Sequence, residues 1–161
     1  MEDIILALIL SILIYLLLAI IIPIILRPHR IYLRRDIQKT RKIKRIAHSL
    51  KARNKEDTLK NIYNYVIKRY KGNEQKYKLL NYPKLFYFNT NEILKRRQFL
   101  SCHQQNLVLR TLLINTKQFD IKDFELKETM TNFGVIHQYI IVNLGKIKYK
   151  IDPFFKIFEK I

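Results

Sequence analysis

Residues 137–152, HQYIIVNLGKIKYKID, constrain the fold most, because their pattern is that of a β-hairpin. The run Ile140–Val142 is β-branched, Leu144-Gly145 is a plausible turn, and KIKYKI alternates charged with apolar side chains. A turn at Leu144-Gly145 places Val142 opposite Ile147 and directs one apolar face of the hairpin toward a core. We therefore predict an antiparallel sheet that contains this hairpin.

The same register places His137 directly opposite Asp152 at the open end of the hairpin. Opposed residues of an antiparallel pair have Cβ atoms about 4.5–5.5 Å apart, so the carboxylate could accept a hydrogen bond from the imidazole. A three-residue loop with a bulge would shift this pairing by one residue. Two interpretations stay open: a histidine–aspartate pair with a chemical role, or polar residues that simply bound the strands.

The single cysteine of the chain, Cys102, lies where the sequence predicts the start of a helix. The residues after it, NLVLRTLLI, are apolar nearly all round a helix, which predicts that the helix is buried. Ser101 followed three residues later by Gln104 is a capping-box pattern, so Cys102 would be the first helical residue. The positive end of a helix favours a thiolate there. The alternative is that Cys102 is an inert, buried apolar residue.

His103 is adjacent to Cys102 in the sequence but should point about 100° away round the helix. We therefore expect His103 to be a poor partner for the thiol, and to be solvated or to form a wall of a cleft.

A thiol of low pKa beside an imidazole that a carboxylate orients is the arrangement for covalent acyl transfer. FLSCHQQNLVLRTLLI followed by HQYIIVNLGKIKYKIDPFF resembles the core of the transglutaminase-like superfamily, which has the papain-like cysteine-protease fold. In that family a cysteine opens a buried helix, a histidine opens a strand, and an aspartate followed by proline closes the next strand. The resemblance covers residues 56–161 and includes the helix-like segment 57–72.

The resemblance implies an α+β fold and a catalytic triad of Cys102, His137 and Asp152. It also implies a thiol peptidase or amidohydrolase that acts on a protein or peptide substrate, with amine transfer less favoured, and that needs no cofactor or metal. Three departures from the family pattern suggest an alternative, a catalytically inactive scaffold that binds a partner at the cytoplasmic membrane face. These departures are Leu100 in place of a glycine, Gln138-Tyr139 after the histidine, and the absence of tryptophan. Candidates for the second oxyanion donor are Tyr82, Tyr87 and Gln98.

The segment from Ile4 to Leu26 is an uncharged apolar run, which predicts a transmembrane helix over residues 1–26. The strongly basic flank that follows, residues 27–55, would keep the C-terminal domain in the cytoplasm and the N-terminus outside. The expected location is therefore the cell membrane, with a single pass. One cysteine, with no internal disulfide possible, agrees with a reducing compartment.

The basic segment 27–55 accounts for much of the formal net charge of +18. Within it, Ile43, Ile46, Ala47 and Leu50 fall at helical spacing and predict an amphipathic helix. This helix could lie on anionic lipid headgroups, at about 1 kcal/mol per basic side chain. It could equally be a solvated linker. Nucleic-acid binding is least favoured because the sequence offers no reader module.

Several smaller elements are expected within residues 56–161. NTNEILKRR predicts a short helix capped by Asn89, Thr90 or Asn91. A strand is expected around 124–128, followed by a turn through 132–134. The aromatic residues Tyr82 and 86–88 would belong to the core or wall a cleft.

Overall fold

The structure is a computed structural model that describes residues 2–26, 37–71, 89–95, 100–130 and 136–161. It consists of two compact units, Met1–Ile31 and Tyr32–Ile161. The expected turn at 132–134 and the aromatic residues at 82 and 86–88 lie outside the described residues.

The first unit contains helix α1 (Glu2–Leu26). In the part of the chain that the structure describes, no helix has both the length and the apolarity of a membrane span. The predicted transmembrane helix over residues 1–26 is therefore wrong. The fold class that combined it with a papain-like core is corrected accordingly.

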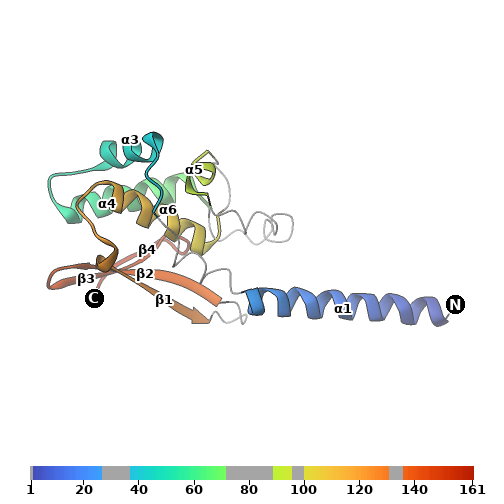
Figure 1. The fold of residues 1–161 in the computed structure, drawn as a ribbon. Coiled ribbons are helices and arrows are strands. Elements are labelled where there is room, and N and C mark those ends of the chain that lie inside the picture. The colour runs from blue at the N-terminus through green and yellow to red at the C-terminus, as the bar shows by residue number, and fades with distance from the viewer. Residues whose placement is uncertain (1, 27–36, 72–88, 96–99, 131–135) are drawn as a thin grey trace. The chain divides into compact units, whose positions relative to one another are not determined.

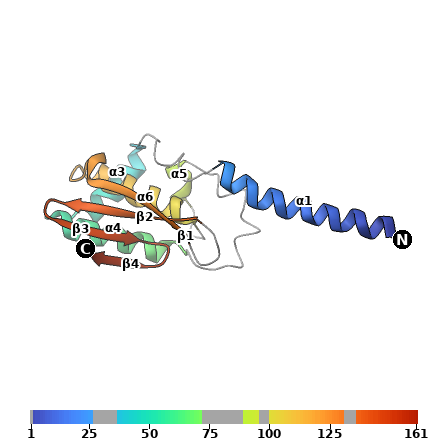
Figure 2. The ribbon, with the colours of Figure 1, turned by 90° about the horizontal axis from the view of Figure 1, so that it is seen from below.

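The second unit is an α+β structure in which helices cover one face of an antiparallel sheet (Figures 1 and 2). The sheet follows chain order: β1 (Phe124–Met130), β2 (Ile136–Leu144), β3 (Ile147–Asp152) and β4 (Ile157–Lys160). The helices are α3 (Arg41–Leu50), α4 (Lys55–Arg69), α5 (Thr90–Ile93) and α6 (Cys102–Asn115), and a 3₁₀ turn, η3 (Ile121–Asp123), precedes β1. The expected antiparallel sheet and the strand at 124–128 are confirmed.

Helix α6 lies at the centre of this unit. Eleven of its residues are buried, from His103 to Leu113. It contacts α3, α4, α5 and β2, so that helices and sheet enclose it on several sides. Five of the buried residues are apolar and six are polar or charged, so burial extends beyond the apolar positions of this helix.

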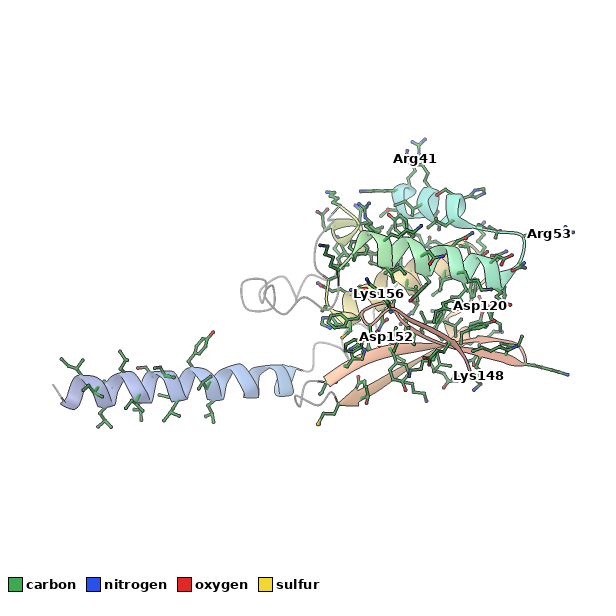
Figure 3. The ribbon with its side chains drawn as sticks, turned by 180° about the vertical axis from the view of Figure 1, so that it is seen from behind. Arg41, Arg53, Asp120, Lys148, Asp152 and Lys156 are labelled. Atoms are coloured by element: carbon green, nitrogen blue, oxygen red, sulfur yellow. The ribbon has the colours of Figure 1, made fainter. Side chains whose placement is uncertain are left out.

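The amphipathic helix expected in the basic segment is α3. Its N-cap is Thr40, whose side chain accepts the backbone N–H of Ile43 at 3.3 Å. Ile43 and Ala47 are fully buried, and α3 packs on α6 and α4. The basic side chains lie on the other face, and Arg41 extends from the helical layer away from the sheet that carries Lys148 (Figure 3). This helix is therefore part of the folded unit.

The two neighbouring helices also begin at side-chain caps. Asn54 accepts the backbone N–H of Asp57 at 2.8 Å and starts α4. Asn89 accepts the backbone N–H groups of Asn91 and Glu92 and starts α5, as one of the three predicted caps. These caps satisfy N–H groups that the first helical turn leaves without partners.

The hairpin pairs β2 with β3 in a register that differs from the predicted one. Leu144 lies opposite Ile147, and Val142 lies opposite Tyr149, so the two-residue loop is Gly145-Lys146. The predicted placement of His137 directly opposite Asp152 is therefore wrong. Gly145 has φ of 72°, and glycine is the residue that takes positive φ at the first position of a tight hairpin loop.

The predicted faces of the hairpin are nevertheless correct. Moving the loop by one residue shifts each pairing by two positions, and a shift of two keeps every side chain on its own face. Gln138, Ile140, Val142, Tyr149 and Ile151 are buried, as the alternation predicts. The register error therefore changes which residues are opposed but leaves the core unchanged.

We predict that Gly145→Ala lowers the free energy of unfolding by roughly 1–2 kcal/mol. A Cβ at this position meets no atom within 4 Å, so the cost arises from the positive φ alone. Urea denaturation followed by circular dichroism measures the change. Lys146→Ala, at the exposed neighbouring position of the loop, is the matched control and should leave stability unchanged. Equal stability of both variants would contradict the assigned loop.

Candidate active site

Cys102 is the first residue of α6, as predicted, and Ser101 is the N-cap. The side chain of Gln104 accepts the backbone N–H of Ser101 at 3.3 Å, which is the capping-box contact that the sequence indicated. Cys102 is partly exposed, whereas the residues that follow it along α6 are buried. The thiol therefore lies at the positive end of a buried helix, on a residue that is itself partly exposed.

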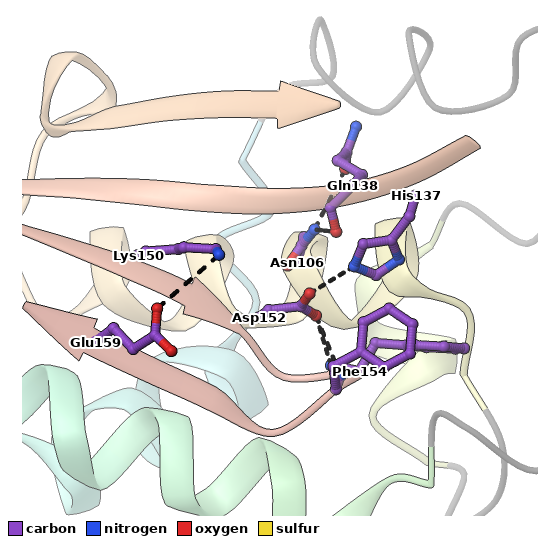
Figure 4. Close-up of polar contacts among 8 residues, drawn as sticks. Asn106, His137, Gln138, Lys150, Asp152, Phe154 and Glu159 are labelled. Atoms are coloured by element: carbon purple, nitrogen blue, oxygen red, sulfur yellow. Dashed lines mark hydrogen bonds and ion pairs between the residues drawn. The ribbon is translucent and has the colours of Figure 1, made fainter. Parts of the chain in front are cut away.

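His137 and Asp152 form a buried hydrogen bond between β2 and β3 (Figure 4). The distance from His137 Nε2 to Asp152 Oδ2 is 2.5 Å, and the two residues are 5% and 2% exposed. In a register that pairs Ile140 with Ile151, His137 and Asp152 are not directly opposed. The imidazole therefore reaches the carboxylate diagonally across the two strands. The predicted contact is thus present, although the predicted register is not.

The carboxylate of Asp152 is oriented by the backbone immediately after it. Its Oδ1 atom accepts the N–H groups of Phe154 and Phe155 at 3.1 and 3.2 Å. Its Oδ2 atom is thereby left facing His137. Sequence reasoning missed this turn, although an aspartate followed by proline is a known signal for a side chain that caps its own turn.

The imidazole of His137 is covered by two aromatic rings that sequence reasoning also missed. The ring centroids of Phe154 and Phe155 lie 5.5 and 4.6 Å from that of His137. Phe155 is 41% exposed, so it covers the imidazole from the solvent side. These contacts restrict the rotation of the imidazole and reduce its access to water.

The thiol and the imidazole shift the pKa values of one another in opposite directions. Burial raises the pKa of Cys102, but hydrogen bonds with His103 and His137 lower it to about 6. Burial lowers the pKa of His137, but hydrogen bonds with Asp152 and Cys102 raise it to about 9. Between about pH 6 and pH 9 the pair is therefore a thiolate and an imidazolium.

His103 differs from its expectation. It is buried, its Nε2 atom lies 3.0 Å from Ser101 Oγ, and its interaction with the thiol lowers the pKa of Cys102. The expectations that it is solvated and a poor partner for the thiol are wrong, but the alternative, that it forms a wall of a cleft, agrees with its place in the lining of a small hollow. The rotation of about 100° per helical residue sets the direction of the Cβ atom only. The longer side chain of a histidine in the first turn can still reach back toward the N-cap.

A second hydrogen bond ties the cysteine helix to the histidine strand. Asn106, one turn after Cys102, donates from Nδ2 to the backbone oxygen of Gln138 at 2.9 Å (Figure 4). Gln138 directly follows His137 in β2. This buried contact fixes the height of α6 against β2, and therefore the approach of the thiol to the imidazole.

The described residues contain no group of histidine, cysteine and carboxylate side chains that could hold a metal ion. The predicted oxyanion donors Tyr82, Tyr87 and Gln98 lie outside the described residues. Comparison with known proteins found no matching family model, no matching curated protein and no matching solved structure.

We predict that iodoacetamide labels Cys102 with a rate that rises through a midpoint near pH 6. Because the hydrogen bond with His137 lowers the pKa of the thiol, His137→Ala should move the midpoint upward and slow labelling at pH 7. His48→Ala, which removes an exposed histidine of α3, should leave the profile unchanged. A midpoint near the pKa of a free thiol, about 8.5, that His137→Ala does not change would contradict the assigned thiolate–imidazolium pair.

We also predict that Asp152→Asn moves the same midpoint upward, by roughly one to two pH units. The amide can still accept the backbone N–H groups of Phe154 and Phe155, but it carries no charge to stabilise the imidazolium. Because the pKa of His137 is then lower, less of the imidazole is charged at a given pH, and the thiolate is stabilised less. Titration of the His137 ring protons by NMR should show a lower pKa in the variant, and an unchanged pKa would contradict the role assigned to Asp152.

Proposed function

We propose that this protein is a cysteine-dependent acyl-transfer enzyme, a thiol peptidase or amidohydrolase of the transglutaminase-like kind. Cys102 is the nucleophile, His137 is the general base and acid, and Asp152 orients the imidazole. The observation that carries the proposal is the buried contact of His137 with Asp152 beside a cysteine whose pKa is about 6. Together these groups have the composition and the connectivity of a nucleophile, base and orienting residue.

In the acylation step the thiolate attacks the carbonyl carbon of a carboxamide or peptide bond. A carbon–sulfur bond forms, and negative charge develops on the carbonyl oxygen. The backbone N–H of Cys102 lies in the first turn of α6, where such groups have no helical partner and can stabilise that charge. The carbon–nitrogen bond then breaks as the His137 imidazolium gives its proton to the leaving amine.

In the deacylation step His137 acts as a base. The now neutral imidazole takes a proton from water, and the oxygen of that water attacks the thioester carbon. The carbon–sulfur bond breaks and releases a carboxylic acid and the thiolate. The hydrogen bond from Nε2 to Asp152 leaves Nδ1 as the nitrogen that exchanges the proton in both steps.

The substrate class is a protein or peptide, because the resemblance of the sequence to the transglutaminase-like core implies amide chemistry. Hydrolysis is favoured over amine transfer on the same ground. Since the chemistry depends on a free thiolate, the enzyme would act in a compartment that keeps thiols reduced.

We predict that p-nitrophenyl acetate acetylates Cys102 with a burst of p-nitrophenolate. Cys102→Ala should abolish the burst. It should also abolish the acetyl adduct, which adds ~42 Da to the protein in the mass spectrum. His137→Ala should slow acetylation at pH 7 roughly 100-fold or more. Decay of the adduct with and without added glycinamide separates hydrolysis from amine transfer.

His48→Ala is the matched control for loss of a histidine and should retain the burst. A wild-type protein that labels with iodoacetamide near pH 6 but forms no acyl adduct would have the thiolate without the proposed reaction. A thiol that reacts with neither reagent would contradict the proposal altogether and favour an inactive scaffold.

A further inference from the structure

The outer face of α3 carries a row of basic side chains that the acyl-transfer chemistry does not use. Its members, here called the basic row, are Arg41, Lys44, Arg45 and His48, and all four are exposed. Their spacing of three, four and seven residues places them on one face of the helix. The buried residues of α3 lie on its other side, which packs on α6 and α4. Arg41 extends from the helical layer away from the sheet (Figure 3).

The basic row surrounds a shallow hollow at the surface. This hollow has a volume of about 510 Å³, is wide open to solvent, and is lined by the basic row and Ser49. From the first to the last residue of the row the helix rises about 10 Å, at 1.5 Å per residue. A single small anion cannot reach side chains spread over this length, whereas a surface that repeats anionic groups can contact all of them.

The positive charge of the basic row has no counter-charge within the part of the chain that the structure describes. Helix α3 contains no acidic residue, and its exposed basic side chains form no ion pair with the described residues. Elsewhere in this unit, exposed lysines lie beside carboxylates: Lys60 beside Glu56, and Lys127 and Lys148 beside Glu125. Uncompensated positive charge therefore gathers on the outer face of α3.

The first unit indicates which anionic surface is the partner. Large apolar side chains of α1 among residues 4–17 are 49–72% exposed. Apolar side chains exposed in such number mark a surface that contacts an apolar partner. A bilayer with anionic headgroups offers negative charge and an apolar phase together. Nucleic acid offers only the charge, and the basic row has no phenylalanine, tyrosine or tryptophan on which a base could stack.

We propose that the basic row of α3 binds the surface of an anionic lipid bilayer. The guanidinium groups of Arg41 and Arg45 donate to oxygens of the lipid headgroups, and Lys44 adds a further charge. Each basic side chain near such a surface raises the partition onto it roughly fivefold. Because α3 is packed on α6 and α4, this contact holds the folded unit with α3 toward the lipid. The binding is independent of the proposed acyl transfer, since none of the reacting groups belongs to α3.

The test measures how the full chain sediments with two kinds of vesicle. One kind is phosphatidylcholine alone, and the other contains roughly 30% phosphatidylserine. We expect stronger partition onto the phosphatidylserine vesicles, and salt at about 0.5 M should remove the difference by screening the charges. Contacts of the apolar side chains of α1 are common to both vesicles, so the difference between the two partitions measures the contribution of charge.

Two double variants with the same change in net charge locate the contact. Arg41→Gln with Arg45→Gln should lower partition onto the phosphatidylserine vesicles roughly 25-fold, toward the value for phosphatidylcholine. Lys127→Gln with Lys148→Gln removes two charges that lie beside a carboxylate, and should retain most of the preference. For each variant, a pH profile of iodoacetamide labelling at Cys102 that matches the wild type shows that the protein is folded.

Equal partition of the wild type onto both vesicles would overturn the proposal, whether or not the variants fold. Equal losses in the two double variants would also overturn it, because the attraction would then come from the net charge of +18 as a whole. A DNA duplex of about 20 base pairs is the third probe. Tighter binding to this duplex than to the phosphatidylserine vesicles, lost in the α3 variant alone, would identify nucleic acid as the partner and overturn the proposal of lipid.

Discussion

The enclosure of α6 is the constraint on which the rest of this unit depends. The apolar residues Leu107 to Leu109, Leu112 and Leu113 of this helix are buried, and α3, α4, α5 and β2 pack around it. Its first residue cannot be enclosed in the same way, because the chain enters there and the N-terminal N–H groups need partners. Cys102, at that first residue, is partly exposed, as are Ile114 and Asn115 at the other end of the helix.

The pKa of the Cys102 thiol is set by two opposing effects, burial and neighbouring imidazoles. Burial alone would keep Cys102 protonated, as in an ordinary core cysteine. Two imidazoles reverse this outcome, and one of them is itself stabilised in its charged form by a buried carboxylate. The charge on the sulfur thus depends on residues of α6, β2 and β3 at once, so the complete fold is needed to form it.

Much of this arrangement could be predicted from local patterns, and the exceptions have physical reasons. The capping box placed Cys102, and alternation placed the faces of the hairpin, because both signals are local in sequence. Alternation has a period of two and therefore cannot detect the shift that moved Tyr149 opposite Val142. The aromatic cover of His137 gave no signal, since a pair of phenylalanines has the same appearance in any core.

In the turn after β3, main-chain atoms orient the Asp152 carboxylate, and side-chain rings shield the His137 imidazole. Main-chain amides of residues 154 and 155 orient the Asp152 carboxylate, while the rings of the same two residues shield the imidazole. Amides are common to every amino acid except proline, whereas the rings are specific to the residues present. The identity of these two positions can therefore vary over evolutionary time, changing the entrance to the site without disturbing the aspartate behind it.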